Sequence, residues 1–335
     1  MIELLSDDSN IKKYLPIMGQ KGYISAKSSN YGWFKNKNYA IAFVIDKRAI
    51  FKRLIFMCEV VSLDGNDVSA NEEKEFLESV IEYIKEKKLA DFIYKAHSNV
   101  IFKSCPNGAE CVPWGTFVVE LDGTDDELLK KFKSRERSKI RKAIREGVVV
   151  KESKDVELVY NIIKDTMQRQ NSIHYPSLEY LESLINNIPQ NVKFFLPYYQ
   201  NRVQGCTVIV FDKKRAYVPY AGSIAKPEHV GALHLMHYEA MRNMYKLGVS
   251  EYDFVGTRLY DFEGSKFSGI NRFKKAFNPR IDRGYSFKYI IDPIKYNLFN
   301  LTSKAYLSLK GFSYIDPIDQ IKSEMQSKEA ILWQE

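Results

Sequence analysis

The chain has 335 residues, of which 45% are hydrophobic and 27% are charged. This length favours two domains over one, and the composition excludes a disordered chain. Lysine and arginine outnumber aspartate and glutamate by 50 to 42, and the formal net charge of +8 favours anionic partners such as phosphate esters or nucleic acid without identifying one.

Membrane, secretory and metal-binding classes are also disfavoured. No apolar run approaches the roughly 20 residues of a membrane-spanning helix, and the N-terminus is acidic with no apolar core, so we expect a cytoplasmic protein. The four cysteines, Cys58, Cys105, Cys111 and Cys206, are too few for a disulfide framework. Cys105 and Cys111 have no second pair, which disfavours zinc. We therefore expect structural or incidental cysteines and neither a metal nor a tightly held cofactor.

The first part of the chain predicts alternating helices and strands. Residues 1–20 indicate a short helix, and 39–63 indicate two strands with a turn at Asp46-Lys47-Arg48. Residues 71–89 have the apolar spacing of an amphipathic helix. Two further strands are expected near 92–96 and 116–121.

A basic helix is predicted over 126–146, where positions 130–145 hold nine lysines and arginines and Gly147 follows as a stop signal. Such a helix is commonly a solvated amphipathic face. Here local acids are few, and uncompensated cations repel one another unless an anion lies opposite. We place the domain boundary at this helix.

The rest of the chain predicts a second, richer run of the same kind. Its strands are expected as a three-stranded meander over 192–223, a short strand at 252–256 and a last strand near 285–291. Its helices are expected at 155–171, 177–187, 231–247, 292–310 and 315–330.

Four stretches outside the basic helix could carry chemistry, and each has a plain structural alternative. Residues 33–37 place cations beside aromatics, as at a phosphate site or in a surface turn. Residues 220–223 end a strand with Tyr, Gly and Ser. Residues 252–256 precede the cationic, aromatic segment 267–277, whose phenylalanines also suit a core.

Familiar catalytic motifs are missing from the sequence. No nucleophile has a visible base, and the chain has no G-x-S-x-G, H-E-x-x-H or Walker loop. His234 and His237 are three residues apart, but no third metal ligand is evident nearby, so packing or surface roles are favoured.

From about residue 30 to residue 300 the ordered set of motifs resembles the Fem-type aminoacyltransferases, which build the peptide side-bridges of peptidoglycan. The set is specific as an ordered group, although each motif alone is weak. It comprises Gly32-Trp33-x-Lys35, Trp114-x-Thr116, Arg137-x-x-Ile140-Arg141-Lys142-Ala143-x-x-x-Gly147, Tyr220-Ala221-Gly222-Ser223, Tyr252-Asp253-Phe254-x-Gly256 and Phe273-Lys274-x-x-Phe277.

The resemblance implies an α/β fold of two GNAT-like acyltransferase domains, with mixed sheets flanked by helices and without the helical arm of some members. We expect an acceptor-binding first domain at 1–124 with a returning C-terminal helix at about 312–335. The basic connecting helix would be 125–147 and the second, catalytic domain 148–311. One departure is Asn278, where the family often has glycine.

The resemblance also implies transfer of an amino acid from aminoacyl-tRNA to an amine of a muropeptide, UDP-linked or lipid-linked, in cell-wall biogenesis and cell shape. An activated ester needs no covalent nucleophile, which fits the missing triad. By the motif match, Lys274 stabilises developing negative charge and Phe273 shapes the site. The remaining residues implied are Lys35 and Trp33 for the acceptor, Tyr220, Ser223, Tyr252 and Asp253 for substrate positioning, and Arg137, Arg141 and Lys142 for tRNA.

Two other interpretations of the sequence remain open. An acyl-CoA-dependent N-acyltransferase could act on an amino sugar or amino acid, although residues 228–233 fit a pyrophosphate loop poorly, with Glu228 and Leu233 against it. A non-enzymatic RNA-binding protein could use the basic helix alone. The sequence does not fix the amino acid transferred, the acceptor or the oligomeric state.

Overall fold

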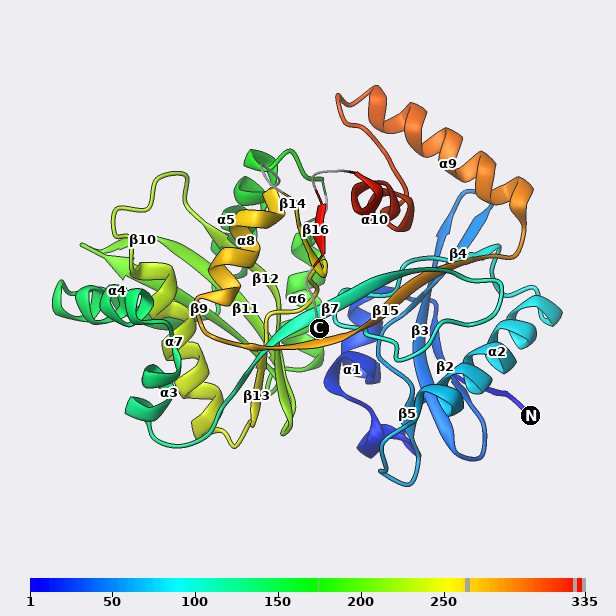
Figure 1. The fold of residues 1–335 in the computed structure, drawn as a ribbon, viewed down its shortest axis with the longest axis horizontal. Coiled ribbons are helices and arrows are strands. Elements are labelled where there is room, and N and C mark those ends of the chain that lie inside the picture. Colours follow the sequence, from blue (N-terminus) through cyan, green and yellow to red (C-terminus); the bar gives the residue numbers. More distant parts are fainter. Residues whose placement is uncertain (174, 263–265, 328–329, 333–335) are drawn as a thin grey trace. The chain divides into compact units, whose positions relative to one another are not determined.

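The computed structural model describes residues 1–173, 175–262, 266–327 and 330–332 (Figure 1). The chain forms two compact units. Unit 1 comprises Met1–Gly115, Gly256–Gly264 and Asp282–Glu335, and unit 2 comprises Thr116–Val255 and Ser265–Ile281. Strands β7 (Glu110–Glu120) and β15 (Arg280–Ile290) each contribute residues to both units.

These units differ from the domains expected from the sequence. The basic helix expected to connect two domains is part of unit 2, and residues 282–311, expected in the second domain, belong to unit 1. The predicted C-terminal element at 312–335 is helix α10 (Pro317–Gln326) followed by strand β16 (Ala330–Leu332). Its residues 328–329 and 333–335 lie outside the described part of the chain.

Unit 1 is built on a mixed sheet of order β1-β2-β3-β4-β6-β15, with β5 paired to β3. The β4–β6 pair is parallel, and β6 is antiparallel to β15. The strands before β7 are β1 (Glu3–Leu5), β2 (Tyr31–Lys35), β3 (Tyr39–Arg48), β4 (Phe51–Phe56), β5 (Val61–Ser62) and β6 (Phe92–Ile93). A separate antiparallel pair joins β14 (Tyr260–Phe262) to β16.

Three of the described helices of unit 1 begin at side-chain caps that the sequence supplies. Helix α2 (Ala70–Glu86) starts at Ser69, which forms a capping box with Glu72, and buries Phe76, Val80 and Ile84 on one face. Asp292 and Asp316 cap α9 (Pro293–Ser308) and α10 and are each followed by a proline in the first turn. Helix α1 (Lys21–Lys27) precedes β2.

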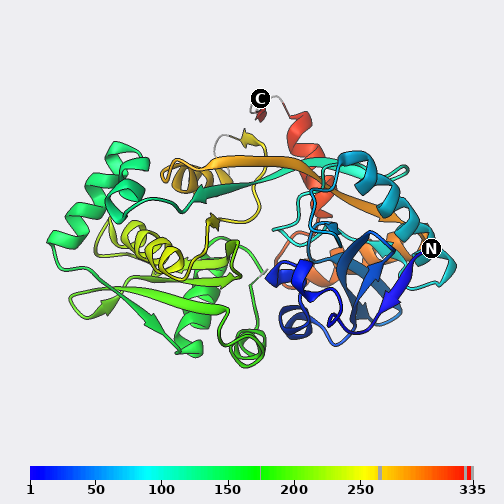
Figure 2. The same ribbon diagram turned by 90° about the horizontal axis from the view of Figure 1, so that it is seen from below.

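Unit 2 is built on the strand order β7-β13-β12-β11-β9-β10, with β8 paired to β9. Strands β12 and β13 are parallel, whereas β13 is antiparallel to β7 and β11 is antiparallel to both β12 and β9. The strands are β8 (Val149–Ser153), β9 (Val192–Tyr199), β10 (Arg202–Val203), β11 (Gly205–Phe211), β12 (Arg215–Ser223) and β13 (Glu251–Asp253). The helices are α3 (Asp125–Lys131), α4 (Ser134–Arg145), α5 (Val156–Arg169), α6 (Leu178–Asn187), α7 (Ala232–Lys246) and α8 (Lys266–Lys275). Helix α7 packs against β9 and β11, and α4 lies beside α7 (Figure 2).

Three predictions of secondary structure were wrong. Residues 1–20 form β1 and two short 3-10 turns rather than a helix. The turn between β3 and β4 lies at Ala49 and Ile50, because β3 continues through Arg48 and Ala49 takes a φ of +52°. The basic helix is broken between α3 and α4 at Phe132, whose ring is buried and whose backbone is extended.

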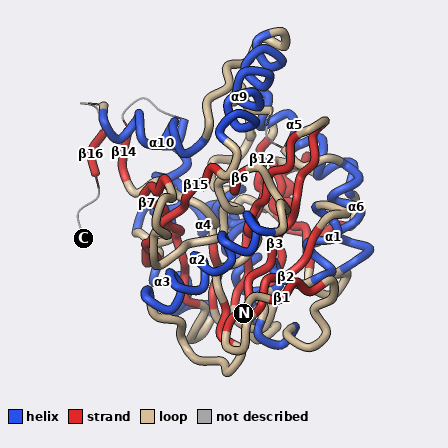
Figure 3. Tube along the Cα trace, turned by 90° about the vertical axis from the view of Figure 1, so that its right-hand side faces the viewer, coloured by secondary structure: helices blue, strands red, loops and turns tan. Residues whose placement is uncertain are grey.

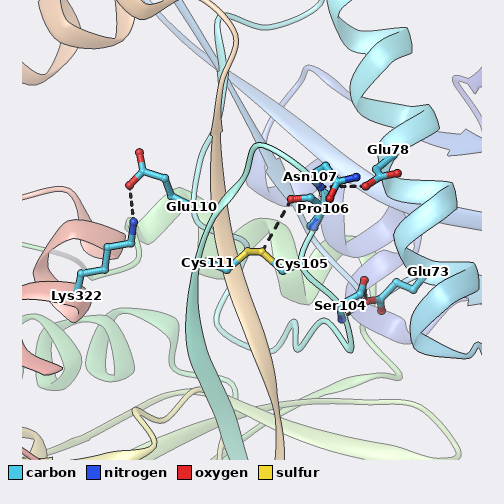
Figure 4. The surroundings of a disulfide bond; sticks show 9 residues. All are labelled: Glu73, Glu78, Ser104, Cys105, Pro106, Asn107, Glu110, Cys111 and Lys322. Atoms are coloured by element: carbon cyan, nitrogen blue, oxygen red, sulfur yellow. Dashed lines mark hydrogen bonds and ion pairs between the residues drawn. A yellow bond between two sulfur atoms is a disulfide. The ribbon is translucent and has the colours of Figure 1, made fainter.

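A disulfide joins Cys105 to Cys111 in unit 1, although no pairing was expected from the sequence (Figure 4). The loop that it closes is tied to α2, because Ser104 N–H and Oγ donate to Glu73 Oε1 at 2.8 and 2.7 Å and Asn107 N–H donates to Glu78 at 3.0 Å. Cys58 and Cys206 are buried free thiols, and burial raises the pKa of each to about 12.

No described helix has the length and apolar character required to cross a bilayer.

Candidate functional site

Lys274 lies near the end of α8 in unit 2, half-buried, and its Nζ donates a hydrogen bond of 2.8 Å to the backbone oxygen of Val255. Burial lowers the pKa of Lys274 to about 8, and the negative charge of Asp253 acts in the opposite direction. This amine therefore changes its charge close to neutral pH. A group with that property can donate a proton or a hydrogen bond to an oxygen that gains negative charge.

The backbone that holds Lys274 is conformationally strained. Val255 follows β13 and has a φ of +38°, which costs free energy for a β-branched residue. Its N–H donates to Asp253 Oδ1 at 2.7 Å, so the same carboxylate that influences the Lys274 amine also fixes this turn.

Asp253 is fully buried and is held from three sides. Thr116 Oγ1 donates to its Oδ1, Val255 N–H donates to the same oxygen, and Arg215 Nη1 lies 3.2 Å from Oδ2. Burial raises the pKa of Asp253, and the guanidinium of Arg215 opposes that shift. Arg215 is held in turn by Glu251 at 2.6 Å. The structure thus places Asp253 beneath the Lys274 turn, where its carboxylate has no exposed surface to offer a substrate.

Tyr252 is likewise fully buried, and its hydroxyl is 2.8 Å from His237 Nδ1. Burial lowers the pKa of His237 to about 3, with the charges of His234 and Lys274 acting in the same direction, so His237 is neutral at physiological pH. The sequence predicted that Tyr252 and Asp253 contact substrate directly. In the structure both side chains are fully buried.

Phe273 and Phe277 form an aromatic group with the two histidines of α7. The half-buried Phe273 ring lies 4.8 Å from that of His234 and 5.5 Å from that of His237. Phe277 is fully buried beside Phe254, at 5.3 Å between ring centroids. These contacts anchor the end of α8 and therefore the position of Lys274.

The departure from the family at Asn278 has a structural explanation. Asn278 has a φ of +52°, in the left-handed region where asparagine is the best-tolerated residue after glycine. An asparagine can therefore occupy the position after α8 where the resemblance led us to expect glycine.

The N-terminus of α7 is covered by α4 and by its own loop. The Gly231 N–H donates to His229 Nδ1 at 3.1 Å, and His229 Nε2 lies 3.0 Å from Glu146. A Cβ added at Gly231 would lie 2.4 Å from the carbonyl oxygen of Lys139. Protein atoms therefore occupy both the Gly231 N–H and the space beside its Cα.

Tyr220 and Ser223 lie on β12, next to β13. Tyr220 is half-buried, with its ring 6.1 Å from that of Tyr180. The Ser223 N–H donates to Thr166 Oγ1 at 3.0 Å. A Cβ on Gly222 would lie 2.9 Å from that same oxygen, so the glycine allows α5 to approach this strand.

The predicted acceptor residues of unit 1 lie on β2. Trp33 is fully buried, and its Nε1 donates to the Gly19 oxygen at 2.8 Å, so it supports the unit from inside. Lys35 is half-buried, with its Nζ 3.5 Å from Glu3. From the resemblance we expected both residues to lie in the binding site for the acceptor substrate.

Lys95 is a candidate that the sequence motifs did not identify. It is half-buried in the segment after β6, and its Nζ lies 3.7 Å from the centre of the Trp114 ring. Burial lowers the pKa of Lys95 to about 7, and the neighbouring charge of Arg258 acts in the same direction. Arg258 is paired with Glu324, which also accepts from the Tyr260 hydroxyl at 2.6 Å. A single lysine after a strand has no distinctive spacing. The sequence therefore marked this place only through the motif that contains Trp114, the ring that Lys95 contacts.

The residues predicted to bind tRNA have different settings on α4. Arg137 Nη1 donates to the backbone oxygens of Lys130 and Phe132 at 3.1 and 2.6 Å and so ties the end of α3 to α4. Arg141 and Lys142 are exposed, and Lys142 Nζ is 3.8 Å from Glu146. The exposed cations on and beside α4 are Lys133, Arg135, Arg141, Lys142 and Arg145.

Within the described ranges, no three His, Cys, Asp or Glu side chains are grouped so that they could hold a metal ion. His234 Nε2 instead lies 2.9 Å from Glu136, which is also contacted by Lys139 at 2.7 Å. Burial lowers the pKa of His234 to about 4. Both histidines of α7 thus serve packing and hydrogen bonding.

The comparisons with known proteins agree with this architecture. A family model described as the FemAB family matches residues 100–204 and 198–304. Among solved structures, one titled "Crystal structure of FemX" is similar with a TM-score of 0.64 and 16% identity, covering 88% of this chain and 99% of that one. A conserved protein of unknown function from Bacteroides thetaiotaomicron has a TM-score of 0.50 and 9% identity, covering 84% and 93%. No curated protein sequence matches the chain. The predicted α/β class, with mixed sheets flanked by helices, is confirmed.

Proposed function

The chain belongs to the FemAB family, and from this premise we propose that it is an aminoacyltransferase acting in peptidoglycan cross-bridge formation. It would move an amino acid from aminoacyl-tRNA to an amine of a cell-wall precursor peptide. The observation that carries the proposal is the half-buried Lys274 amine, with its pKa lowered to about 8, fixed on the strained turn at Val255.

The reaction requires little covalent chemistry from the protein. The acceptor amine attacks the ester carbonyl, a C–N bond forms and the bond to the ribose oxygen breaks. The amine loses one proton and the departing ribose oxygen gains one, so that the products are an amide and a ribose hydroxyl. Negative charge develops first on the carbonyl oxygen and then on the departing ribose oxygen. A protonated Lys274 stabilises these oxygens by donating a hydrogen bond, and one such donor is commonly worth about 3–4 kcal/mol. The remaining acceleration comes from holding amine and ester together.

The other residues have supporting parts in this proposal. Asp253 holds the Val255 turn, and its negative charge, which Arg215 favours, raises the pKa of Lys274 and so favours the protonated amine. Tyr252 and Phe273 hold α7 and α8 through His237. Tyr220 and Ser223 remain candidates for positioning the substrate.

We assign anion recognition on the acceptor to Lys35 and Lys95 in unit 1. Lys35 is half-buried at the end of β2. The Lys95 amine lies on the Trp114 ring and 3.4 Å from the Ala96 oxygen, and no carboxylate of the described residues is paired with it. A phosphate or carboxylate of a muropeptide would raise the pKa of Lys95 by adding the missing negative charge.

A specific contact favours tRNA over CoA as the donor. In the GNAT-like alternative, a CoA diphosphate needs the backbone N–H groups at the strand-to-helix turn before α7. In this chain the Gly231 N–H is bonded to His229, and the Lys139 oxygen fills the space beside it. The exposed cations of α4 supply a surface suited to RNA phosphates.

The test is a donor competition with purified protein. A mixture of aminoacyl-tRNAs carrying labelled amino acids would be incubated with a UDP-linked muramyl pentapeptide, in parallel with labelled acetyl-CoA. We expect a mass increment on the acceptor from the tRNA arm only, and that increment identifies the amino acid. Transfer only from CoA would overturn the donor assignment. A further arm would supply a lipid-linked precursor as acceptor. No transfer from either donor to either acceptor would count against an enzyme and favour an RNA-binding role.

A further inference from the structure

Helix α9 has apolar side chains on two opposite faces. The inner face belongs to the core of unit 1, where Tyr296 and Phe299 pack in one cluster with Phe51 and Phe92. The outer face is defined by Ile294, Leu298, Leu301, Ala305 and Leu309 and is called here the α9 stripe. These positions recur every three or four residues, so they form one line along the helix.

The α9 stripe is exposed along its whole length. Ile294 is 81% exposed, Leu298 40%, Leu301 64% and Leu309 89%. A single exposed leucine is ordinary on a protein surface, but a row over 16 residues, about 24 Å of helix, marks an interaction site. In Figures 1 and 3, α9 lies at the margin of unit 1.

The charged residues within 293–315 are all lysines, although Asp292 caps the start of the helix and Lys295 pairs with Asp292 and Asp91. Residues 293–315 contain Lys295, Lys304 and Lys310 and no aspartate or glutamate. Lys304 and Lys310 are exposed, and Lys310 lies over the Tyr306 ring at 4.5 Å. Tyr306 is itself 56% exposed. Apolar side chains bordered by lysines and a tyrosine match the boundary between acyl chains and anionic headgroups.

We propose that α9 docks unit 1 onto the surface of an anionic lipid bilayer. The α9 stripe enters the interfacial layer, and Lys304 and Lys310 contact the headgroups. At about 24 Å the helix is shorter than the roughly 30 Å hydrocarbon core, and its inner face is committed to the unit, so it lies in the plane of the membrane. A second copy of the chain is the other occupant that an exposed apolar face could take, and the lipid-free measurement below distinguishes it.

If the proposed function holds, an enzyme docked in this way should prefer a lipid-linked precursor as acceptor over a soluble one. The docking itself needs no substrate, so it is tested without the transfer reaction.

The test is flotation of the full chain with vesicles of phosphatidylcholine alone or with phosphatidylglycerol added. The variant Ile294→Ser/Leu301→Ser/Leu309→Ser removes the stripe without touching the inner face. A matched control, Ile50→Ser/Val149→Ser/Val230→Ser, changes three side chains of similar exposure elsewhere. A third variant, Lys304→Gln/Lys310→Gln, removes charge alone.

We expect binding to the anionic vesicles by the wild type and the control, and at least about tenfold weaker partitioning by the stripe variant. The lysine variant should lose about fivefold per charge on anionic vesicles. Absence of wild-type binding, or equal binding by the stripe variant, would overturn the proposal whatever the transfer assay shows. Self-association in lipid-free sedimentation that disappears in the stripe variant would replace the membrane by a second copy.

Discussion

The Nζ of Lys274 is bonded at 2.8 Å to the backbone oxygen of Val255, a β-branched residue held at a φ of +38°. The two residues come from different elements, α8 and the turn after β13, and each restrains the other. Backbone strain of this kind costs about 1–3 kcal/mol and persists only where surrounding contacts enforce it. Here the enforcing contacts are those of Asp253, which accepts from the Val255 N–H.

Replacing Lys274 tests the proposed chemistry. We expect Lys274→Ala to lower kcat/KM for transfer about a hundred- to a thousandfold, because the oxyanion loses a charged donor. Arg272→Ala is the matched control, since Arg272 is an exposed cation on the same helix. Equal losses in both variants, or an active Lys274→Ala, would contradict the role assigned to Lys274. Thermal unfolding of both variants verifies that each is folded.

The charge of Lys274 should change near pH 8. Its folded pKa of about 8 lies below the ordinary 10.5, so the unfolded chain holds more protons than the folded chain between these values. The free energy of unfolding contributed by this group therefore rises with pH across that window, and the cost of burying the charged amine is fully present below it. Transfer that depends on the protonated amine should fall as pH rises through about 8.

Two NMR titrations check this value. The Lys274 side-chain signal, assigned by its loss in Lys274→Ala, should titrate near pH 8, apart from the other lysines. Asp253→Asn removes the nearby negative charge, so the midpoint should move lower. A midpoint above 10 in the wild type would contradict the burial argument.

The ion pair beneath the site should matter more for stability than any surface pair. Arg215→Met leaves the buried carboxylate of Asp253 without its guanidinium, and we expect a loss of about 3–5 kcal/mol in urea unfolding. Arg202→Met is the comparison, because Arg202 pairs with Glu228 at the surface. That change should cost less than about 1 kcal/mol. Similar costs for the two substitutions would show that the Asp253 network is not a structural centre.

Much of the fold could be predicted from sequence because its signals are local. The apolar spacing of α2, α5, α6 and α7 and the strand pattern of β9, β11 and β12 indicated the correct element types. The family assignment confirms the resemblance that the ordered motifs predicted.

The failures share a physical cause, which is tertiary contact overriding local preference. The basic stretch has continuous helical propensity, yet burial of Phe132 and a hydrogen bond from the Lys133 N–H to the Ala276 oxygen break it into α3 and α4. The burial of Trp33 and Tyr252 was likewise not visible in the sequence. Lys95 was missed for the converse reason, since its low pKa arises from burial and from Arg258, which is distant in the chain.

The disulfide should contribute measurable stability. In the chain-entropy description, closing a loop of about seven residues stabilises a protein by about 2 kcal/mol. We expect Cys105→Ser/Cys111→Ser to lose about that amount, and reductant to lower the unfolding midpoint of the wild type but not of the variant. Thiol titration gives the number of free cysteines. The buried thiols of Cys58 and Cys206 should react only after unfolding. Fast-reacting thiols in the native, non-reduced protein would show that Cys105 and Cys111 are unpaired.

The exposed face of α4 should set the salt dependence of tRNA binding. Arg141→Ala/Arg145→Ala removes two exposed cations without disturbing Arg137, which ties α3 to α4. If these side chains neutralise phosphates, the slope of log affinity against log salt becomes shallower by about 0.7–0.9 for each phosphate that is no longer neutralised. Lys213→Ala/Lys214→Ala makes the same change of net charge in the turn after β11, away from this helix. An equal change in slope for both double variants would mean that tRNA binding depends on net charge alone. A change in slope confined to the α4 variant identifies this helix as the surface that binds the RNA.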